Sequence, residues 1–287
     1  MNTDMLKWTV RWGSYPLIFI GCALLQYQIL ARGLPHWPIA IIVSASGITL
    51  VALLERFQPY TPEWNQDHND TRVDILHAAF SLTLIFTVIE IVTLSRSLLP
   101  DFVAQAGTLW PSAWPLWAQL LAAGAIIDFG LWLMHWLSHK FPFLWRLHAL
   151  HHSSERLYWL NGERRHPLSA ILLASPGLIA VVILGAPAGV IGAWFAIISV
   201  HLAFQHANLD YTVGVFRNLL GVAEIHRGHH KREYEDAQVN FGEFWMIWDQ
   251  LFRTFKYTRT PIGAGEIGIK ESMPLRYTQQ LRWPFQS

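Results

Sequence analysis

Six apolar segments, each close to the length that crosses a lipid bilayer, constrain the fold of this chain more than any other feature. They cover roughly residues 14–31, 37–54, 75–95, 113–134, 168–184 and 188–205. A helix of about 20 apolar residues spans the hydrocarbon core of a bilayer. The second, fifth and sixth segments are short, and Pro176 and Gly177 predict a kink in the fifth. We therefore expect an all-α, multi-pass membrane bundle of about four full spans, with the last two segments forming a helical hairpin whose depth stays open.

The composition agrees with a membrane protein and excludes several kinds of site. Of the 287 residues, 52% are hydrophobic and 14% are charged, whereas about a quarter are charged in soluble domains. The only cysteine, Cys22, excludes a disulfide framework, an iron–sulfur cluster and a thiolate-ligated haem. The sequence has no glycine-rich phosphate loop or dinucleotide fingerprint. It therefore predicts no NAD or flavin site of its own, and it indicates no nucleic-acid partner.

The distribution of positive charge orients the expected bundle. If the segments cross the membrane one after another, the histidine-rich stretches and the N-terminus emerge on the same face. Of the 21 lysines and arginines, only Arg32 and Arg96 fall on the opposite side. Positive residues are enriched on the cytoplasmic side of membrane proteins. We therefore expect the N-terminus, the histidines and the C-terminus to be cytoplasmic.

Eleven of the fourteen histidines fall between His135 and His230, and most are spaced as metal ligands. Three clusters stand out: HWLSH at 135–139, HALHH at 148–152 and HRGHH at 226–230. Histidines three or four positions apart share one face of a helix, so two can serve one metal and the third a neighbouring metal. Imidazole is the commonest metal-binding side chain, and one zinc site needs only three or four. The count therefore indicates two metals, or one metal surrounded by many further imidazoles.

The candidate ligands are the members of these clusters together with one histidine at the end of the sixth segment. They are His135, His139, His148, His151, His152, His206, His226, His229 and His230, with His166 and His201 as further candidates.

Asp128 is a candidate for orienting a ligand. It lies seven residues before His135, two helical turns away on the same stripe. A carboxylate at membrane depth is costly unless it is paired, and we expect it to accept from the outer ring N–H of a ligand histidine. Pairing with an arginine or a backbone group is the alternative. Glu163 and His166 form a single Glu-x-x-His, whereas carboxylate di-iron bundles use two, which disfavours that class.

In their order, these motifs resemble those of the fatty acid hydroxylase/sterol desaturase superfamily. HWLSH is similar to its first histidine box, LHALHHSSE to the second and HRGHH to the last, while RRHP and FQHAN resemble two single-histidine motifs. NFGEFWMIWDQLFRTF, at 240–255, resembles the closing signature. The resemblance covers about residues 125–256. Trp132 and Arg253 depart from the usual pattern without removing a ligand.

The resemblance implies an enzyme that uses two histidine-bound iron ions, dioxygen and external electrons to oxidise an unactivated C–H bond of a lipid. Zinc can replace iron in such a site. The lipid should arrive from the bilayer, passing among segments three to six. A cytoplasmic electron-transfer protein, of small cytochrome or ferredoxin type, should supply the electrons. Residues 1–112 would form a transmembrane region, and residues 113–287 a catalytic domain with a cytoplasmic cap.

The function that we favour is hydroxylation of a fatty acyl chain, a sterol or a related lipid. A lipid desaturase and an enzyme that cleaves ether lipids by oxidation are alternatives within the same superfamily. A membrane protein that handles metal ions is a more distant alternative, because the expected spans carry few polar residues to move an ion. The sequence leaves the substrate, the oligomeric state and the assignment of each histidine to a metal open.

Overall fold

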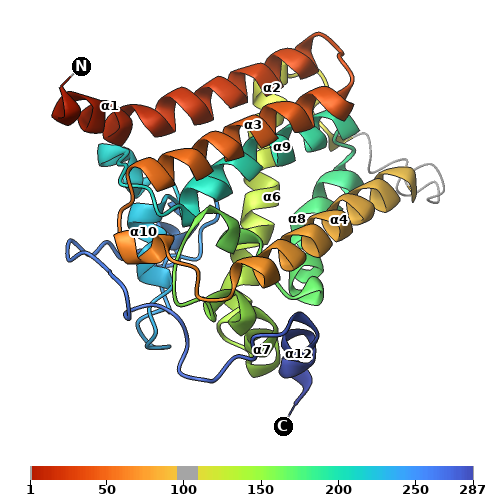
Figure 1. Cartoon of the computed structure of the whole chain (residues 1–287). Coiled ribbons are helices and arrows are strands. Elements are labelled where there is room, and N and C mark those ends of the chain that lie inside the picture. Colours follow the sequence, from red (N-terminus) through yellow and green to blue (C-terminus); the bar gives the residue numbers. More distant parts are fainter. Residues whose placement is uncertain (1, 96–108, 287) are drawn as a thin grey trace.

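The computed structural model describes residues 2–95 and 109–286. The side chains at 36, 37, 85, 86, 88–90 and 92–95 and the stretch 96–108, with Arg96, lie outside the described residues. Within these limits the chain is helical, with isolated β-bridges and no strand (Figure 1). The prediction of an all-α fold is confirmed.

The long helices coincide with the apolar segments. They are α1 (Thr3–Tyr15), which continues through a π-helical turn (Pro16–Ile20) into α2 (Gly21–Ala31), then α3 (His36–Phe57), α4 (Thr71–Ser95), α6 (Leu116–Ser138), α8 (Pro167–Leu184) and α9 (Ala188–His206). Among the described residues, the α1–α2 rod, α3, α6, α8 and α9 are long and apolar enough to cross a membrane. Both helices of the expected hairpin thus reach the length of a span. For α4 the crossing stays a prediction, because part of its side chains lie outside the described residues.

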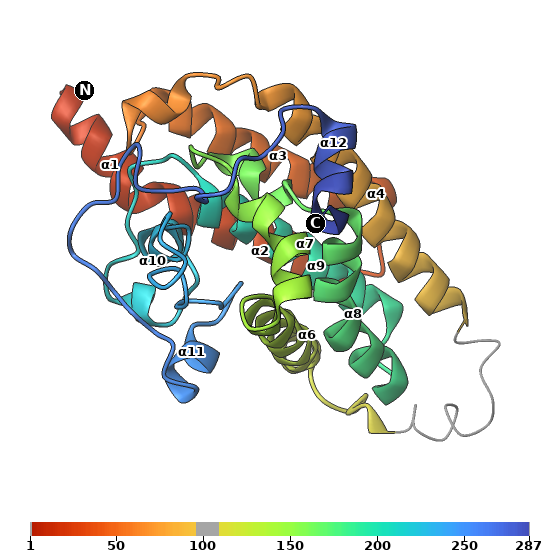
Figure 2. The same cartoon turned by 90° about the horizontal axis from the view of Figure 1, so that it is seen from below.

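Two helix pairs meet on α6. Helix α3 packs against α9 and α4 packs against α8, while α6 contacts both α8 and α9. Figure 2 shows α6 and α8 side by side, and α12 (Tyr277–Arg282) against α4. A short 3-10 helix, η5 (Trp159–Glu163), contacts α3, α4 and α9. The segment that leads from the second histidine cluster into α8 therefore lies at the junction of the two pairs.

Glycines allow α6 and α8 to touch along their backbones. A Cβ on Gly130 would collide with the backbone nitrogen of Gly177, and a Cβ on Gly177 would lie 2.6 Å from the Cα of Ile127. Small residues permit such close approach between membrane helices. Pro176 lies inside an unbroken α8. The Pro-Gly pair thus marks a helix crossing, and the kink that it predicts stays a prediction.

We expect Gly130→Ala to lower the free energy of unfolding by about 1–3 kcal/mol, because an extra methyl group must push two packed backbones apart. Thermal unfolding of the purified protein in detergent would show this as a lower melting temperature. Gly192→Ala on α9 is the matched control, since no atom lies within 4 Å of its added Cβ. Equal melting temperatures for the two variants would contradict the close crossing.

The N-terminal helix contacts the segment after α9 that leads to the last histidine cluster, as the order of the expected spans predicts. Arg11 Nη1 lies 3.0 Å from Asp210 Oδ1, and the backbone N–H of Thr212 donates to the Arg11 carbonyl at 2.9 Å. The C-terminal end packs on α7 (Pro142–His152), where Arg146 Nε donates to the Pro284 carbonyl at 2.8 Å. The part of the chain after α9 is thus a cap of short helices tied to the bundle at both ends.

Candidate metal centre

Nine of the predicted ligands converge into two buried groups. In each group, every histidine offers one ring nitrogen that lies within 4.8 Å of those of the other members. The five-histidine group consists of His135, His139, His148, His152 and His229, and the four-histidine group of His151, His206, His226 and His230. All nine side chains are buried. Each group provides at least as many imidazoles as a metal site requires.

Two short helices supply ligands to both groups. Helix α7 gives His148 and His152 to the five-histidine group and His151 to the four-histidine group. Helix α10 (Ala223–His229), with His230 directly after it, contributes to both groups in the same way. In a helix, the first and last histidines of His-x-x-His-His, at i and i+4, lie on one face. The middle histidine, at i+3, is displaced around the helix toward the neighbouring group. The structure therefore brings together two neighbouring groups, as the spacing of the repeated His-x-x-His-His pattern suggests.

The inner ring nitrogens face one another, and the described part of the chain offers several of them no hydrogen-bond partner other than another imidazole. In the four-histidine group, His226 Nε2 lies 3.0 Å from both His206 Nε2 and His230 Nε2. The buried Nε2 atoms of His135 and His229 have no hydrogen bond within the described part of the chain. Buried polar atoms are seldom left unpaired. Lone pairs that converge on one point fit a shared cation, so the residues present fit a metal.

The outer nitrogens of two ligands are held by backbone carbonyls. His135 Nδ1 donates to the Phe241 carbonyl and His229 Nδ1 to the Val239 carbonyl, both at 2.8 Å. A proton on Nδ1 leaves the lone pair on Nε2, toward the group. Such outer hydrogen bonds fix the tautomer and the orientation of metal-binding imidazoles.

Burial keeps these imidazoles neutral. It lowers the pKa of His148 and His152 well below the ordinary value, and the neighbouring histidines lower it further. The pKa is lowered in the same direction, and first by burial, at His139, His151, His226, His229 and His230. Neutral imidazole is the form that binds a metal.

Asp249 positions the carbonyl that holds His135. Its carboxylate accepts from the backbone N–H groups of Phe241 at 2.9 Å and Gly242 at 2.7 Å, and from the Thr254 hydroxyl at 2.5 Å. In the sequence, Asp249 stands out only as part of the closing signature. Its role was missed because the spacing of that signature does not tell which amides it binds.

The structure corrects the expectation that Asp128 pairs with a ligand histidine. Its carboxylate accepts from the backbone N–H of Phe244 at 2.8 Å, from that of Trp245 at 3.1 Å and from Trp248 Nε1 at 2.9 Å. The closing segment turns beside α6, and its buried amides need acceptors. Asp128 therefore anchors this segment to α6, as the alternative of a backbone partner anticipates, and it acts on the ligands only through that segment.

His166 and His201 lie outside both groups. His166 Nδ1 accepts from the N–H of Leu168 at 3.2 Å at the start of α8, and its Nε2 faces the Leu281 carbonyl at 3.2 Å. His201 Nδ1 lies 2.8 Å from the Tyr15 hydroxyl, and its Nε2 lies 3.1 Å from the Gly221 carbonyl. Both rings therefore have protein partners on each nitrogen.

A charged pair beside the five-histidine group was not predicted. Arg165 Nη2 lies 3.7 Å from Glu243 Oε1, and the same oxygen lies 3.5 Å from His135 Nδ1. Arg165 and Glu243 are both buried. The signal available in the sequence was the unusual charge density of GERRHP next to an apolar segment.

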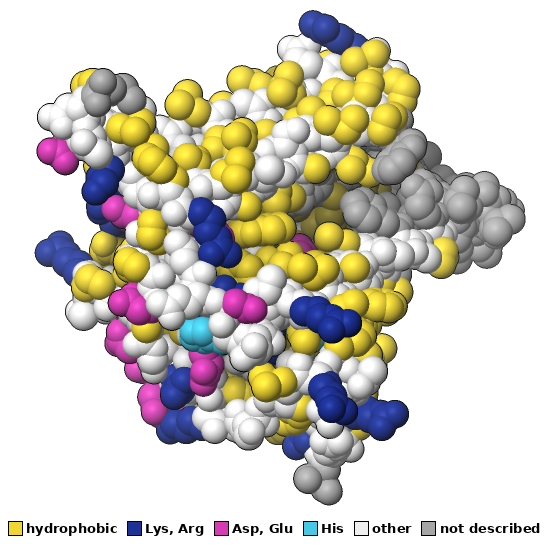
Figure 3. All heavy atoms as spheres, in the orientation of Figure 1, with side chains coloured by type: hydrophobic (Ala, Val, Ile, Leu, Met, Phe, Trp, Pro, Cys, Tyr) yellow, Lys and Arg dark blue, Asp and Glu magenta, His cyan; other side chains and the backbone are white. Residues whose placement is uncertain are grey.

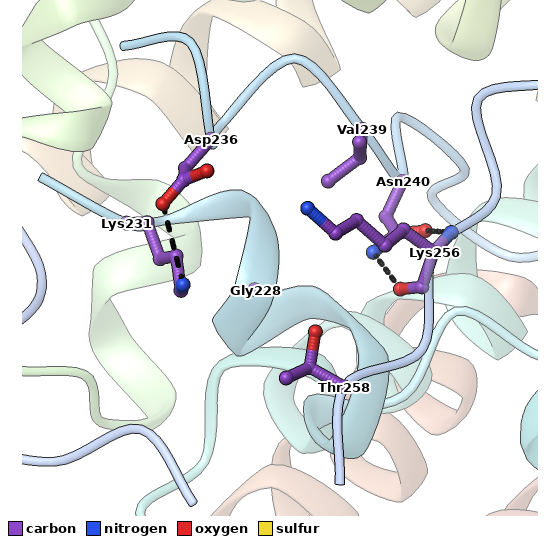
Figure 4. A pocket seen from close by; sticks show the side chains of 7 residues that line it. All are labelled: Gly228, Lys231, Asp236, Val239, Asn240, Lys256 and Thr258. Atoms are coloured by element: carbon purple, nitrogen blue, oxygen red, sulfur yellow. Dashed lines mark hydrogen bonds and ion pairs between the residues drawn. The ribbon is translucent and has the colours of Figure 1, made fainter. Parts of the chain in front are cut away.

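A small pocket opens on the outer side of α10. It is lined by Gly228, Lys231, Asp236, Val239, Asn240, Lys256 and Thr258. Figure 4 shows the side chain of Lys256 reaching into it, while Lys231 is paired with Asp236 at 3.3 Å. Val239 is also the residue whose carbonyl holds His229. The side chain of Lys256 thus lies just outside a candidate ligand.

The stretch that carries the histidine groups, and most of the chain around it, is similar to known proteins. A family model described as fatty acid hydroxylase matches residues 120–254. The chain is 32% identical over 250 residues to ornithine lipid hydroxylase OlsE of Rhizobium tropici, covering 85% of this chain and 75% of that protein. It is 32% identical over 190 residues to alkylglycerol monooxygenase of Danio rerio, covering 61% of this chain and 40% of that protein. For alkylglycerol monooxygenase of Caenorhabditis elegans the identity is 29% over 150 residues, covering 52% of this chain and 28% of that protein. The chain thus spans less than half the length of these two monooxygenases, and no solved structure matches it.

Proposed function

Because this chain belongs to the fatty acid hydroxylase family, we propose that it is a di-iron, oxygen-dependent enzyme that hydroxylates a C–H bond of a membrane lipid. It is a multi-pass integral membrane protein and an oxidoreductase that acts on lipid, since its relatives are lipid hydroxylases and monooxygenases. The observation that carries the finer proposal is the pair of buried histidine groups.

The five-histidine and four-histidine groups would each hold one iron ion. Bound there, the two ions would supply the activation of dioxygen and the oxidation of the C–H bond. The protein itself contributes neutral ligands, carbonyls that orient His135 and His229, and a buried site that excludes water. Exclusion of water protects reactive species from side reactions.

The lipid would reach the histidines sideways from the bilayer. Figure 3 shows a recess between α3 and α4 whose wall carries hydrophobic side chains. Helix α3 packs on α9 and α4 packs on α8, so α3 and α4 belong to different pairs. The recess lies where these two pairs meet, and η5 contacts both α3 and α4 there. An apolar recess that opens between membrane helices suits a lipid chain.

The lipid would come from within the bilayer, whereas the electrons would come from the cytoplasm. We place the N-terminus, the histidine groups and the C-terminus in the cytoplasm, as the positive-inside pattern suggests. A small cytochrome or ferredoxin would dock on the cap near Lys256, outside α10. Complementary charge accelerates such encounters. We also propose that residues 113–287 form the catalytic domain and residues 1–112 a transmembrane region that supports it.

Oxidative cleavage of an ether lipid is a second candidate. The similarity to two alkylglycerol monooxygenases favours it. Desaturation stays an alternative to which the names of these relatives lend no support.

Comparative lipid mass spectrometry tests these proposals. Wild type and a His151→Ala/His229→Ala double variant would be produced in the same host, with iron, dioxygen and an electron donor present. We expect a lipid that gains one oxygen only with the wild type, because the double variant lacks one ligand in each group. Loss of two hydrogens would indicate a desaturase, and loss of an ether lipid with formation of an aldehyde would indicate cleavage. Identical lipid profiles from iron-loaded wild type and the variant would contradict all three.

A further inference from the structure

The closing segment, residues 241–252, packs against the middle of α6. The backbone N–H of Phe244 donates to Asp128 at 2.8 Å, and the ring centroid of Trp248 lies 5.0 Å from that of Phe129. Asp128 is about 15 Å along the axis from the C-terminal end of α6, since a helix rises about 1.5 Å per residue. Because α6 is a membrane span, this contact lies below the surface of the bilayer.

Two other spans give the same depth. The ring centroid of Phe244 lies 5.2 Å from that of Trp194 on α9 and 5.7 Å from that of Phe19 on the α1–α2 rod. Trp194 is about 18 Å before His206, the last residue of α9. Phe19 is about 12 Å beyond Arg11, the last charged residue before the apolar part of the rod. The closing segment therefore reaches in among three membrane spans.

Buried side chains satisfy the irregular backbone of this segment. Non-helical backbone at membrane depth is stable only where protein or a water-filled cavity meets its polar groups. Asp128 and Asp249 accept from four of its backbone amides. Gln205 Nε2 donates to the carbonyls of Gly242 at 3.0 Å and Glu243 at 2.9 Å. Two carboxylates and one amide, all buried, thus do what water would do for a loop in the cytoplasm.

The outer face of the segment is apolar and uncovered. It contains the short helix α11 (Ile247–Leu251), and Figure 2 shows α11 and α8 on opposite sides of α6. Ile247, Leu251 and Phe252 are exposed, Leu251 by 67%. Toward its other end, α6 likewise exposes Trp117 and Leu121. The apolar surface of the span therefore continues onto α11, and such a surface marks contact with lipid or with another protein.

We propose that the closing segment is a re-entrant element, which enters the leaflet on the histidine side and returns, with Ile247, Leu251 and Phe252 against acyl chains. The depth of its contacts and its continuity with the surface of α6 favour lipid as the occupant. The inference rests on the membrane spans and is independent of the proposed chemistry. The carbonyl of Phe241, which holds His135, would then belong to a part of the cap that is immersed in the leaflet.

Spin labelling in nanodiscs of phosphatidylcholine and phosphatidylglycerol tests the proposal. The background is Cys22→Ala, which removes the only native thiol. Labels are attached to Ile247→Cys and to Leu251→Cys. The exposed Leu24→Cys on α2 is the reference for lipid contact, and the exposed Ser272→Cys, in a charged stretch of the cap, is the reference for water.

We expect the labels at 247 and 251 to be broadened by dissolved oxygen as strongly as the label at 24. Their broadening by a water-soluble nickel chelate should be at least about 10-fold weaker than at 272, because polar groups are costly to move into hydrocarbon. Nickel access equal to that at 272 would overturn the proposal. Protection from both reagents would overturn it as well and would point to a protein partner, which spin–spin broadening would identify as a second copy of this chain.

A measurement on the unsubstituted protein decides the matter if a labelled variant does not fold. Hydroxyl radicals generated in water would be used to oxidise exposed side chains in the same nanodiscs. Phe252 is 51% exposed and Tyr234, elsewhere in the cap, is 38% exposed. Acyl chains over Phe252 should reverse this order, so that Tyr234 is oxidised and Phe252 is protected. Oxidation of Phe252 to at least the extent of Tyr234 would contradict the re-entrant element.

Discussion

His226→Ala is expected to empty the four-histidine group and to reduce lipid oxidation by at least about 100-fold. Even the loss of a residue that hydrogen-bonds to a metal ligand lowers metal affinity or activity by about 10–100-fold. This variant removes a ligand itself and leaves only three imidazoles, His151, His206 and His230, in the group. The metal content of the purified protein, measured by elemental analysis, should fall from two ions per chain to one. His139→Ala should have the smaller effect on metal content, because four imidazoles remain in its group.

His166→Ala is the matched control for this series. It also removes a buried imidazole, but His166 lies at the start of α8 outside both groups. It should keep two metal ions per chain. If His226→Ala retained as much metal as His166→Ala, the assignment of His226 as a ligand would be wrong.

Asp128→Ala is expected to lower the free energy of unfolding by about 3–5 kcal/mol. The substitution removes the common acceptor of two backbone amides and the Trp248 indole, and it leaves these three donors buried or half-buried without a partner. The melting temperature in detergent should fall, and iron binding should weaken because the segment that carries Phe241 loses its anchor. The melting temperature of Asp128→Asn should lie between those of the wild type and Asp128→Ala, since one acceptor oxygen remains.

Asp210→Ala provides the comparison for Asp128. This aspartate pairs with Arg11, which is exposed, and surface ion pairs contribute about 0–1 kcal/mol. Similar melting temperatures for the two alanine variants would show that Asp128 does not anchor the closing segment.

Features that depend on local periodicity could be predicted from the sequence. The apolar segments correspond to helices, although the first helix begins at Thr3, well before the expected residue 14. The spacing within HALHH and HRGHH anticipated that each helix serves two groups, because that geometry belongs to the helix itself. The resemblance to the closing signature singled out residues 240–255, and this segment of the cap holds His135 through the Phe241 carbonyl.

Features that depend on tertiary partners could not be predicted. Asp128 lies on the stripe of His135, yet its partners come from a segment more than a hundred residues later. His201 is one turn before His206, but the Tyr15 hydroxyl from the first helix occupies its ring nitrogen. The bend predicted from Pro176 and Gly177 stays a prediction, whereas the contact of Gly177 with the backbone of α6 depends on a facing helix that the local sequence does not reveal. In each case the outcome depends on which distant backbone packs nearby.

The sharing of α7 and α10 between the two groups has a consequence for how the protein is made. The last ligands of the two groups, His229 and His230, are neighbours in the chain. During synthesis, neither group is complete until the ribosome has passed α10, when the preceding helices can already have entered the bilayer. Both sites then become complete within one residue of each other. A nascent chain that stops before α10 therefore offers no finished metal site, and an ion bound in one group would contact both helices that carry the other.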